Sequence, residues 1–510
     1  MKKLILMLCM LLLLCSCVDG ATKIGLDRLS WSQSLPSGEG ITFSGSAPAV
    51  TTDTLYSNNG ILEFDGFKVN RSIGTVSVGP YPECDYVTDG VNDEVQILQA
   101  LDTEKNVYLV GDLHIHNNLT IDGVKNIYGD GPERTVITEH DGASIVFSDI
   151  IKTRFSDLEV ERDLDGGSND GTVGINIERC APFWFSWSIF SNLCVHGSET
   201  NLILGQPWPA HIVGPIDIVD CTFGSDPSDY EVLSDRCNVS VSVLYGIEPR
   251  FTRCEIFGFN HTGFLVGPYV ANNVWISDCY INGYDTAKYG IHIQNGGHLI
   301  SRVGVEACTE ANIYISGGLF VTISDSFSGG NGAIGKTGQA LLINSDDDDI
   351  ENVMISNMQF CFTNGLDGSH SQDSVIEITE TAGGSIVGVQ FDNCHIWNNG
   401  YGAINTTDSS GISIQMCNIN DMHAGNDLYA GYSGISVGGA INFMGDSARG
   451  SIQNNLIAMS NKGITIQDES WGIMVTGNNI YGTNLGGDAI SITTTRPWTI
   501  TNSTNSWMTW

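Results

Sequence analysis

Basic side chains are scarce in this chain, which has 22 Lys and Arg against 58 Asp and Glu and a formal net charge of −36. Nucleic acids and anionic membranes are bound through Lys and Arg, so a surface of this sign repels both. The composition therefore excludes nucleic acid and a bare membrane surface as partners. A polyanionic sugar would be repelled too, unless metal ions or local basic residues intervened.

Long hydrophobic runs are also lacking, since a helix that spans a bilayer needs about 20 apolar residues. The apolar run at 4–14 follows Lys2 and Lys3 and has the length of a signal-peptide core. We therefore expect the mature protein to be exported.

The motif LCSC at 14–17 comes directly after this run. It resembles the lipobox of bacterial lipoproteins, and the resemblance implies that Cys17 becomes the lipidated N-terminus. Cys15 departs from the family pattern, which has a small or β-branched residue there, so plain signal-peptide cleavage a few residues later is an alternative. The expected location is secreted or cell-surface, with membrane contact through the lipid anchor alone.

The chain does contain a short strand that recurs. One copy is VWISDC at 274–279, which has apolar residues at alternate positions and ends in a cysteine. Repeats at variable spacing are typical of stacked coils whose loops differ in length. Further copies end at Cys194, Cys221, Cys254, Cys308, Cys394 and Cys417, and others carry Leu158, Ser326, Met358, Asn455 or Asn478 in the cysteine's slot.

A second group of strands alternates with the first, for example GINI at 174–177, GIHI at 290–293 and GITI at 463–466. Alternating apolar residues bounded by Gly and Asn predict strands with one buried face. We therefore predict an all-β fold, a right-handed single-stranded parallel β-helix of about twelve coils. In such a tube, residues such as Ile218, Ile276 and Phe391 lie stacked above one another.

One short helix is expected at the N-terminal end of this β-helix. In NDEVQILQAL, the residues Val95, Leu98 and Leu101 have helical spacing after the capping candidate Asn92. Such a helix would cover the open end of the core, where strand edges would otherwise be bare.

Three segments around this helix resemble the N-terminal cap and first coils of the pectate-lyase-like β-helix superfamily. They are ECDYVTDGVNDEVQILQAL at 83–101, VYLVGDLHIHNNLTI at 107–121 and IYGDGPERTVI at 127–137. The likeness is specific in 83–137 and extends over 76–500 as architecture. It implies the fold more than a reaction, because the superfamily includes lyases, hydrolases, epimerases, phage tail spikes and adhesins.

The expected organisation has four parts: a signal peptide at 1–17, a linker or small β segment at 18–75, the β-helix at 76–500 and a tail at 501–510. The second part ends in TLYSNNGILEFDGFKVN, which is similar to a small hairpin module of phage tail fibres. That likeness favours a virion appendage, whereas the export signal favours a cellular protein.

The cysteines do not indicate a redox or zinc site, because no Cys-x-x-Cys pair or histidine cluster is present. An odd number of the 14 cysteines remains once Cys9, Cys15 and Cys17 are removed. The slot cysteines should point inward, and we expect them to pack as small apolar side chains, since other residues replace them freely. Disulfides between neighbouring coils are the alternative.

No intact catalytic signature of the superfamily is present. Pectate lyases have a Trp-Ile-Asp-His strand, of which this chain keeps Trp275 and lacks the histidine. The Gly-His-Gly motif of polygalacturonase-like hydrolases is matched only in part, by Gly-His-Leu at 297–299. Catalytic residues can therefore not be carried over from the family.

Strand alternation gives candidates instead. If Ile276 faces the core, the outward and bend positions of successive coils carry acids, arginines and an aromatic ring, a mixture that suits sugar. The candidate substrate contacts are Trp275, Arg250 and Arg253, and the candidate catalytic acids are Asp220, Asp278 and Glu306. Carboxylates two coils apart would be separated by about 9–10 Å, near the range of inverting glycosidases. The alternative is a surface ladder in which Arg253 pairs with Asp220 and Asp278.

Two histidines and two acidic loops are further candidates. His292 should face outward and, with His298, could transfer protons, unless both are simply solvated. The loops 163–170 and 344–349 could hold calcium, for which clustered acids are suitable, or could be solvated acidic loops. No other cofactor is indicated.

Together these patterns predict an exported β-helix that engages an extracellular polysaccharide, with glycan cleavage by hydrolysis or elimination as its leading activity. The competing class is a non-catalytic surface adhesin or a virion spike. The protein would be a monomer or a homotrimer.

Overall fold

The computed structural model describes residues 55–58, 61–64, 67–68 and 75–509, apart from gaps within the last range. The gaps are 164–170, 181–186, 206–212, 225–236, 271–272, 285, 331–337, 347, 362–373, 382–383, 398–402, 422–438, 460–461, 483–488 and 497–500. The signal and lipobox residues, Cys17 included, lie outside the described residues. Among the residues described, no helix has the length and apolar character that a membrane crossing requires.

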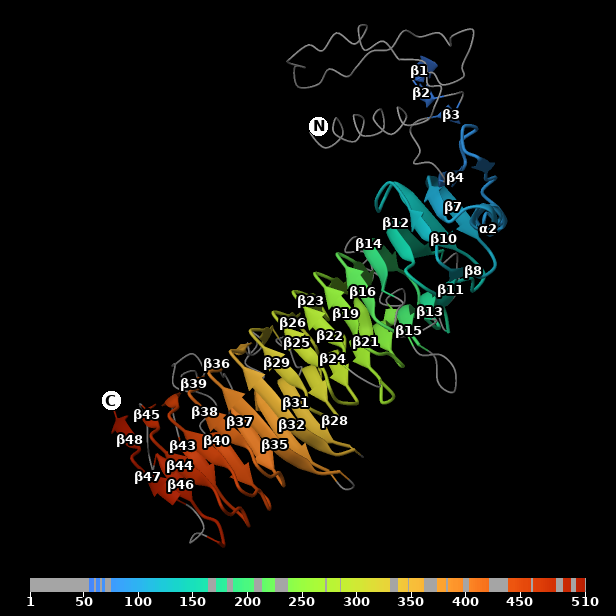
Figure 1. Ribbon diagram of the computed structural model, residues 1–510. Helices are drawn as coiled ribbons and strands as arrows, with labels where there is room; N and C mark the ends of the chain where they lie inside the picture. The colour runs from blue at the N-terminus through green and yellow to red at the C-terminus, as the bar shows by residue number, and fades with distance from the viewer. Residues whose placement is uncertain are drawn as a thin grey trace, which may run out of the picture. The chain divides into compact units, whose positions relative to one another are not determined.

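The chain divides into two compact units, residues 1–72 and 73–510. In the first unit, β1 (Leu55–Asn58), β2 (Ile61–Phe64) and β3 (Phe67–Lys68) form an antiparallel sheet. The second unit contains the remaining strands, and these pair in parallel (Figure 1).

Each coil of the second unit contributes strands to three parallel ladders. The first ladder consists of β6 (Asn106–Leu109), β9 (Asn126–Tyr128), the starts of β12 (Arg154–Arg162) and β14 (Ser188–His196), and then β16 (Ile216–Val219), β19 (Pro249–Thr252), β22 (Trp275–Ser277), β25 (Leu299–Ser301), β29 (Thr322–Ser324), β32 (Ile350–Ser356), β35 (Ile386–Asp392), β38 (Ser413–Gln415), β41 (Ser451–Gln453), β44 (Met474–Thr476) and β47 (Thr501–Ser503). At its N-terminal end, β4 (Thr75–Gly79) pairs with β6 and with β5 (Tyr86–Val87).

The second ladder follows the first after a bend in each coil. It consists of β7 (Gly111–Ile115), β10 (Thr135–Glu139), the ends of β12 and β14, and then β17 (Thr222–Gly224), β20 (Glu255–Phe257), β23 (Tyr280–Asn282), β26 (Gly304–Glu306), β30 (Phe327–Gly329), β33 (Gln359–Cys361), β36 (His395–Trp397), β39 (Asn418–Asp421), β42 (Leu456–Met459), β45 (Asn479–Gly482) and β48 (Ser506–Thr509). A short strand, β28 (Gly318–Leu319), pairs with the start of β32.

The third ladder is a sheet of 14 strands, one from each coil. It consists of β8 (Leu119–Gly123), β11 (Ile145–Ile150), β13 (Val173–Ile177), β15 (Thr200–Leu204), β18 (Cys237–Val243), β21 (Phe259–Val266), β24 (Tyr289–Ile293), β27 (Ala311–Ile315), β31 (Gln339–Ser345), β34 (Ile376–Glu380), β37 (Ile404–Thr407), β40 (Gly439–Met444), β43 (Lys462–Ile466) and β46 (Ile490–Ile492). The predicted right-handed parallel β-helix is confirmed, with 14 strands in this ladder against the twelve or so coils expected.

The core is built from columns of equivalent inward residues. In the first ladder Ile218 pairs with Phe251, Phe251 with Ile276, and Ile355 with Phe391, and all five side chains are buried. The stacking predicted for Ile218, Ile276 and Phe391 is therefore confirmed. A buried aliphatic or aromatic side chain contributes about 1.5–3 kcal/mol relative to an exposed one, so each coil is held by its contacts with the coils on either side.

The bend between the first and second ladders uses a left-handed residue in each coil. Asp220, Arg253 and Asp278 have φ angles of 56°, 54° and 56°. The residue after the bend points into the core and is the slot that the repeat pattern identified. The same bend is made by Asp157, Asn192, Arg302, Asp325, Asn357, Asn393, Met416, Asn454, Gly477 and Thr504.

Two copies of the repeat were aligned wrongly. Asn192 makes the bend in its coil, so the slot holds Leu193, and Cys194 lies half-buried on the second ladder. In another coil Arg302 makes the bend and Val303 fills the slot, whereas Cys308 follows a different bend at Ala307. A cysteine does not mark the register, because the register is set by the bend residue with its left-handed backbone conformation.

The slot cysteines are buried free thiols, as expected. Cys221, Cys254 and Cys279 occupy three successive coils, and the Cys254 amide donates to the Cys279 sulfur at 3.4 Å. Cys394 and Cys417 fill the slot in two other neighbouring coils. These thiols act as small apolar side chains that fit the narrow corner inside the bend.

The capping helix exists but presents a different face. Helix α2 (Glu94–Thr103) buries Ile97, Ala100 and Leu101, whereas Val95 is exposed. The N-cap residue is Asp93 instead of Asn92, and its carboxylate accepts hydrogen bonds from the amides of Gly90 and His114. The N-cap was assigned wrongly because the Asp93 carboxylate binds the amide of His114 in β7 and caps no amide of its own first turn.

The C-terminal boundary also differs from the expectation. Strands β47 and β48 continue the first and second ladders beyond residue 500. Residues 501–509 are therefore part of the last coil and not a separate tail.

Met416 offers a test of the bend. Its side chain is 54% exposed and its φ is 53°, a conformation that costs an ordinary L residue about 1–2 kcal/mol and that Asn tolerates better. We expect Met416→Asn to raise the free energy of unfolding by about 1 kcal/mol in urea titrations. The control is Met354→Asn, because Met354 is equally exposed but lies in extended strand β32, and it should give no gain. An equal shift in both variants would contradict the role of the bend.

Candidate functional site

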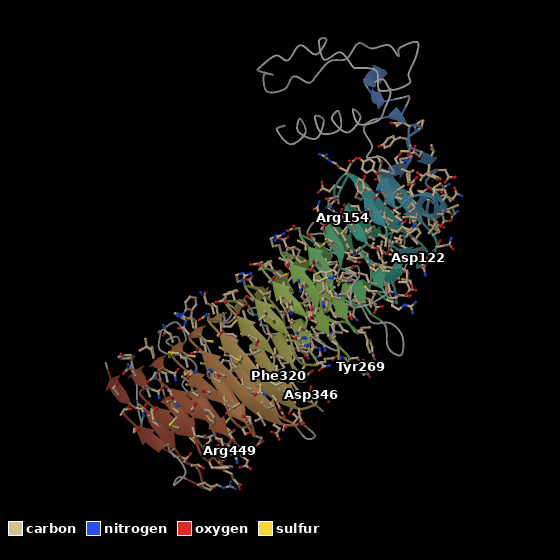
Figure 2. The ribbon with its side chains drawn as sticks, viewed as in Figure 1. Asp122, Arg154, Tyr269, Phe320, Asp346 and Arg449 are labelled. Carbon is tan, nitrogen blue, oxygen red and sulfur yellow. The ribbon has the colours of Figure 1, made fainter. Side chains whose placement is uncertain are left out.

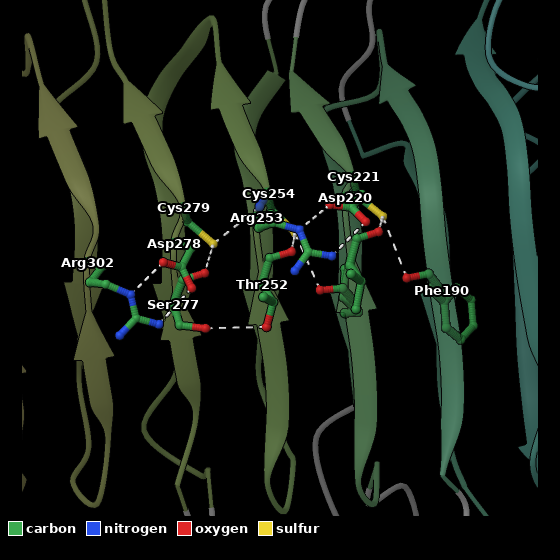
Figure 3. A network of polar contacts seen from close by, with 12 residues as sticks. Phe190, Asp220, Cys221, Thr252, Arg253, Cys254, Ser277, Asp278, Cys279 and Arg302 are labelled. Atoms are coloured by element: carbon green, nitrogen blue, oxygen red, sulfur yellow. Dashed lines mark hydrogen bonds and ion pairs between the residues drawn. The ribbon is translucent and has the colours of Figure 1, made fainter.

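Charged bend residues form a row of ion pairs along one edge of the first ladder (Figure 3). Arg253 donates to Asp220 through Nε at 2.6 Å and Nη2 at 2.8 Å. Arg302 binds Asp278 in the same bidentate way, at 2.6 and 2.8 Å. Three predicted site residues, Asp220, Arg253 and Asp278, are thus brought to one edge, but Asp278 pairs with Arg302 of the following coil and not with Arg253. Arg302 was missed because its coil had been aligned on Cys308.

This pairing limits what the aspartates can do. The hydrogen bonds from Arg253 hold the pKa of Asp220 below its usual range, and those from Arg302 do the same to the pKa of Asp278. Both carboxyls are therefore ionised at neutral pH. Glycoside hydrolysis needs one protonated carboxylic acid, so neither aspartate is suited to that role.

Arg250 and Trp275 meet on the outer face of the first ladder. The two residues are directly paired in register, and the Arg250 guanidinium lies 4.8 Å from the centre of the Trp275 ring. On its other side, the same guanidinium is 5.7 Å from the ring of Trp187. The indoles remain 51% exposed at Trp187 and 39% at Trp275. We call these three residues the aromatic stack.

Glu306 lies apart from the aspartates. It is the last residue of β26 on the second ladder, where it accepts a hydrogen bond from the Tyr280 hydroxyl at 2.9 Å. It comes four residues after the bend residue Arg302, a span of about 13 Å in an extended strand. The expected grouping of Glu306 with Asp220 and Asp278 is therefore wrong.

His298 is buried, contrary to the expectation of an outward histidine. It is 3% exposed, and its Nδ1 accepts a hydrogen bond from the Val274 amide at 3.1 Å. Burial lowers the pKa of its imidazole to about 4. Because Leu299 faces outward and Ile300 inward, strand alternation turns His298 into the core.

His292 does face outward, on the third ladder, within a set of polar aromatic residues. Its ring stacks on that of Tyr314 with centroids 4.5 Å apart and planes at 18°, and its Nε2 lies 2.9 Å from the Ser316 hydroxyl. The Tyr289 ring is 4.9 Å from that of Tyr314. Tyr314 donates to Asp346, which lies beyond the end of β31 and is labelled in Figure 2. We call these five residues the third-ladder cluster.

The protonation states in this cluster are set mainly by burial. Burial, with the nearby His261, lowers the pKa of His292 to about 4, so the imidazole is neutral at neutral pH. Burial and neighbouring carboxylates raise the pKa of Tyr289 and of Tyr314 above the usual range. A neutral imidazole bonded to a hydroxyl is a base beside a nucleophile.

Sequence reasoning missed Tyr314 and Ser316, although a signal existed. The strands GIHI at 290–293 and ANIYI at 311–315 are consecutive members of one strand family. Aligning them places His292 beside Tyr314, which is the pairing the structure shows.

The calcium loops are only partly described. Asp163, the first residue of one loop, binds His140, and the rest of that loop lies outside the described residues. In the other loop Asp349 accepts hydrogen bonds from the amide and hydroxyl of Ser385 at 3.0 and 2.7 Å, while Asp346 is held by Tyr314. Asp163, Asp346 and Asp349 therefore have protein partners.

No protein-family model and no curated protein matches this chain. Solved structures that resemble it include the A-module of mannuronan C-5 epimerase AlgE6 from Azotobacter vinelandii, at a TM-score of 0.33 and 13% identity, covering 82% of this chain and 96% of that one. Others are a GH87 α-1,3-glucanase catalytic unit from Streptomyces thermodiastaticus (0.42, 13%, 86% and 70%) and the Dettilon tailspike protein (0.37, 13%, 83% and 69%). The parallel β-helix itself is shown by the strand ladders of this chain. At these scores the likeness carries no argument about the activity of this chain.

The Asp278–Arg302 pair has a testable pH dependence. Because the pKa of Asp278 is lowered in the folded state, the pair stabilises the protein above the unfolded pKa and is lost as the pH falls through the folded one. We expect Asp278→Asn to lower the unfolding midpoint slightly at pH 7, and the difference from the unchanged protein to vanish near pH 2.

Salt provides the control for this comparison. The difference caused by Asp278→Asn should shrink in high salt, because exposed ion pairs are screened. Asp325→Asn, which keeps an oxygen that can accept the hydrogen bond from the neutral Asn357, should show a smaller salt dependence. A difference for Asp278→Asn that persisted at pH 2 would contradict the pairing.

Proposed function

We propose that this protein is an exported polysaccharide-binding β-helix, and that the glycan lies on the first ladder at the aromatic stack. The observation that carries the proposal is the exposure of Trp187 and Trp275 on either side of Arg250. Large exposed aromatic rings are costly on a surface unless they contact a partner. Indole rings pack against the C–H faces of sugar rings, and a guanidinium donates to hydroxyl or carboxylate groups.

The surface beside the stack also suits a glycan. Thr252, Ser277, Ser301 and Ser324 follow one another in register along the first ladder, and the hydroxyls of Thr252 and Ser277 are 3.3 Å apart. These hydroxyl groups repeat at the coil spacing of about 4.8 Å and can exchange hydrogen bonds with sugar hydroxyls. Arg250 supplies a local positive charge on an acidic protein, which would favour uronic acid residues over neutral sugars.

The export signal and the lipobox-like motif support a location outside the cytoplasm. In this proposal the protein is secreted, or is held at the cell surface through lipidated Cys17. Mass spectrometry of the mature N-terminus distinguishes the two forms, and an uncleaved chain would contradict both.

Binding without cleavage is the function that the geometry of the first ladder supports best. Its two site aspartates are ionised and bound by arginine, and Glu306 lies on the second ladder, beyond the bend that holds them. A surface adhesin or spike would need only the aromatic stack.

The stack can be tested with a matched control. We expect Trp275→Ala and Arg250→Ala each to weaken binding to an acidic polysaccharide at least tenfold in calorimetry, because each removes ring or guanidinium contacts. Met474→Ala is the control: Met474 lies in the same outward column and is also 39% exposed, and its loss should leave binding unchanged. Equal effects of all three variants would contradict the proposal. New reducing or unsaturated ends in the same incubations would show that the glycan is also cut.

A second candidate function is hydrolysis of acyl esters on a glycan, at the third-ladder cluster. It is favoured by the hydrogen-bonded pair of His292 and Ser316, which has the base and nucleophile of acyl transfer. In this reaction the Ser316 hydroxyl would attack the ester carbonyl while His292 takes its proton. The bond to the sugar oxygen then breaks, the sugar leaves as an alcohol with that proton, and water hydrolyses the acyl-serine to release the acid.

The pH profile tests this candidate. Because the pKa of His292 is about 4, the free base is present above that pH, and release of acetate from an acetylated glycan should rise around pH 4 and stay level to pH 7. Ser316→Ala should abolish the release, and Ser491→Ala, which removes a hydroxyl from β46 at the far end of the third ladder, should not. A midpoint near 6.5, the pKa of an ordinary histidine, would contradict the assignment to His292.

A further inference from the structure

A thiol, an imidazole and a carboxylate meet on the second ladder, at a place that neither function above uses. Glu159 of β12 is directly paired with Cys194 of β14, and His196 lies two residues further along β14 on the same face. The ligand atoms of the three side chains all lie within 4.8 Å of one another, and each residue is half-buried. Figure 1 labels both strands, which are adjacent in the ladder.

Cys194 differs from the slot cysteines in its surroundings. The slot thiols point into the core and lie among apolar side chains. Because the bend in its coil falls at Asn192, Cys194 is moved to the outer face, beside a histidine and a glutamate. The coil thus places a thiol where it can reach solvent and an ion.

The donor set is specific for a class of metal. Sulfur and imidazole nitrogen together favour Zn²⁺ over the hard cations Ca²⁺ and Mg²⁺, which prefer oxygen. Zinc binds sulfur at about 2.3 Å and nitrogen or oxygen at about 2.0–2.2 Å, so three ligands around one ion lie within about 4 Å of each other. The Nε2 of His196 is already 2.8 Å from a carboxylate oxygen of Glu159. Small rotations of side chains are enough to bring the three ligands to one ion.

The carboxylate is also held in place from outside the cluster. The second oxygen of Glu159 accepts a hydrogen bond from the Glu133 amide at 2.8 Å. Glu161, which is paired with His196 in register, is held by the Thr138 hydroxyl at 2.8 Å. Such outer contacts orient ligands and raise the affinity of a metal site.

We propose that Glu159, Cys194 and His196 bind one zinc ion with an open fourth position. On binding, the Cys194 thiol loses a proton to solvent and its thiolate forms the zinc–sulfur bond. The ring proton of neutral His196 moves through solvent from Nε2 to Nδ1, so that the Glu159–His196 hydrogen bond is replaced by one metal bond to Nε2 and one to the carboxylate. The thiolate and the carboxylate balance the charge of the ion. The fourth position accepts water or an oxygen of a ligand, and the site joins two neighbouring coils.

Cobalt is the probe for this site, because a thiolate bound to Co²⁺ gives a charge-transfer band in the near ultraviolet. We expect the reduced full-length protein to show this band at saturation with one Co²⁺ per chain, and Zn²⁺ to abolish it by competition. Cys194→Ser should remove the band, and Glu159→Gln should keep it while weakening the affinity for Co²⁺ at least tenfold.

A matched control comes from the same ladder. Cys361 is another half-buried cysteine of the second ladder, and Cys361→Ser should leave the band intact. Binding by the histidines His114, His116 and His140, which lie together near the N-terminal cap, would give no thiolate band.

Zinc should also raise the thermal unfolding midpoint of the unchanged protein and of Cys361→Ser, but not of Cys194→Ser. Two results cover the case in which Cys194→Ser is unstable. One is the unfolding midpoint with zinc, and the other is the band of Glu159→Gln, which keeps the thiol and must still show it. Absence of the band in the unchanged protein, or its persistence in Cys194→Ser, would overturn the proposal.

Discussion

Parallel stacking of coils in register is the constraint on which this structure depends. A single coil cannot bury its apolar residues, because a turn of three short strands has no second layer to pack against. Stacking places Ile276 between Phe251 and Ile300, and the same relation repeats from coil to coil. The hydrogen bonds of the ladders and the apolar columns therefore require the same register, and a slip of one residue would turn every inward side chain outward.

The left-handed bend holds that register. A residue with φ near 55° cannot move along the chain without placing a less tolerant residue in the bend. Asp, Asn and Gly are suited to this conformation, yet Arg253, Arg302 and Met416 also adopt it. At the two arginines, the bidentate contact with an aspartate of the preceding coil accompanies the conformation. The bend residues thus combine a backbone requirement with contacts between coils.

Regular stacking also explains how functional groups arise on the outer faces. Each outward column presents one side chain per coil at about 4.8 Å, so side chains distant in sequence become neighbours. The aromatic stack, the third-ladder cluster and the Glu159–Cys194–His196 group each combine residues of different coils. In an acidic protein, these groups provide a cation, a neutral base and a thiol at three separate places on the surface.

Several features of the sequence were sufficient to predict the architecture. Alternation of apolar residues in strands such as GIHI predicts one buried face, and recurrence of the strand predicts stacked coils, because both depend on local spacing alone. The burial of Cys254 and Cys279 followed for the same reason. The position of the capping helix was predicted, but not its face, since Asp93 binds the amide of His114 in a strand 21 residues away.

The sites were decided by tertiary structure. Sequence spacing placed Arg250 beside Trp275 correctly, because no irregular coil lies between them. Sequence spacing placed Cys194 and Glu306 wrongly, because a cysteine was used to mark the register. In these coils the bend lies at Asn192 and Arg302. Which side chains meet across coils depends on where each coil bends and how long its loop is. The sequence by itself determined that the chain forms a stacked β-helix, because periodicity is local, whereas only the folded coils determined which outward residues are neighbours, because that depends on register between segments far apart in the chain.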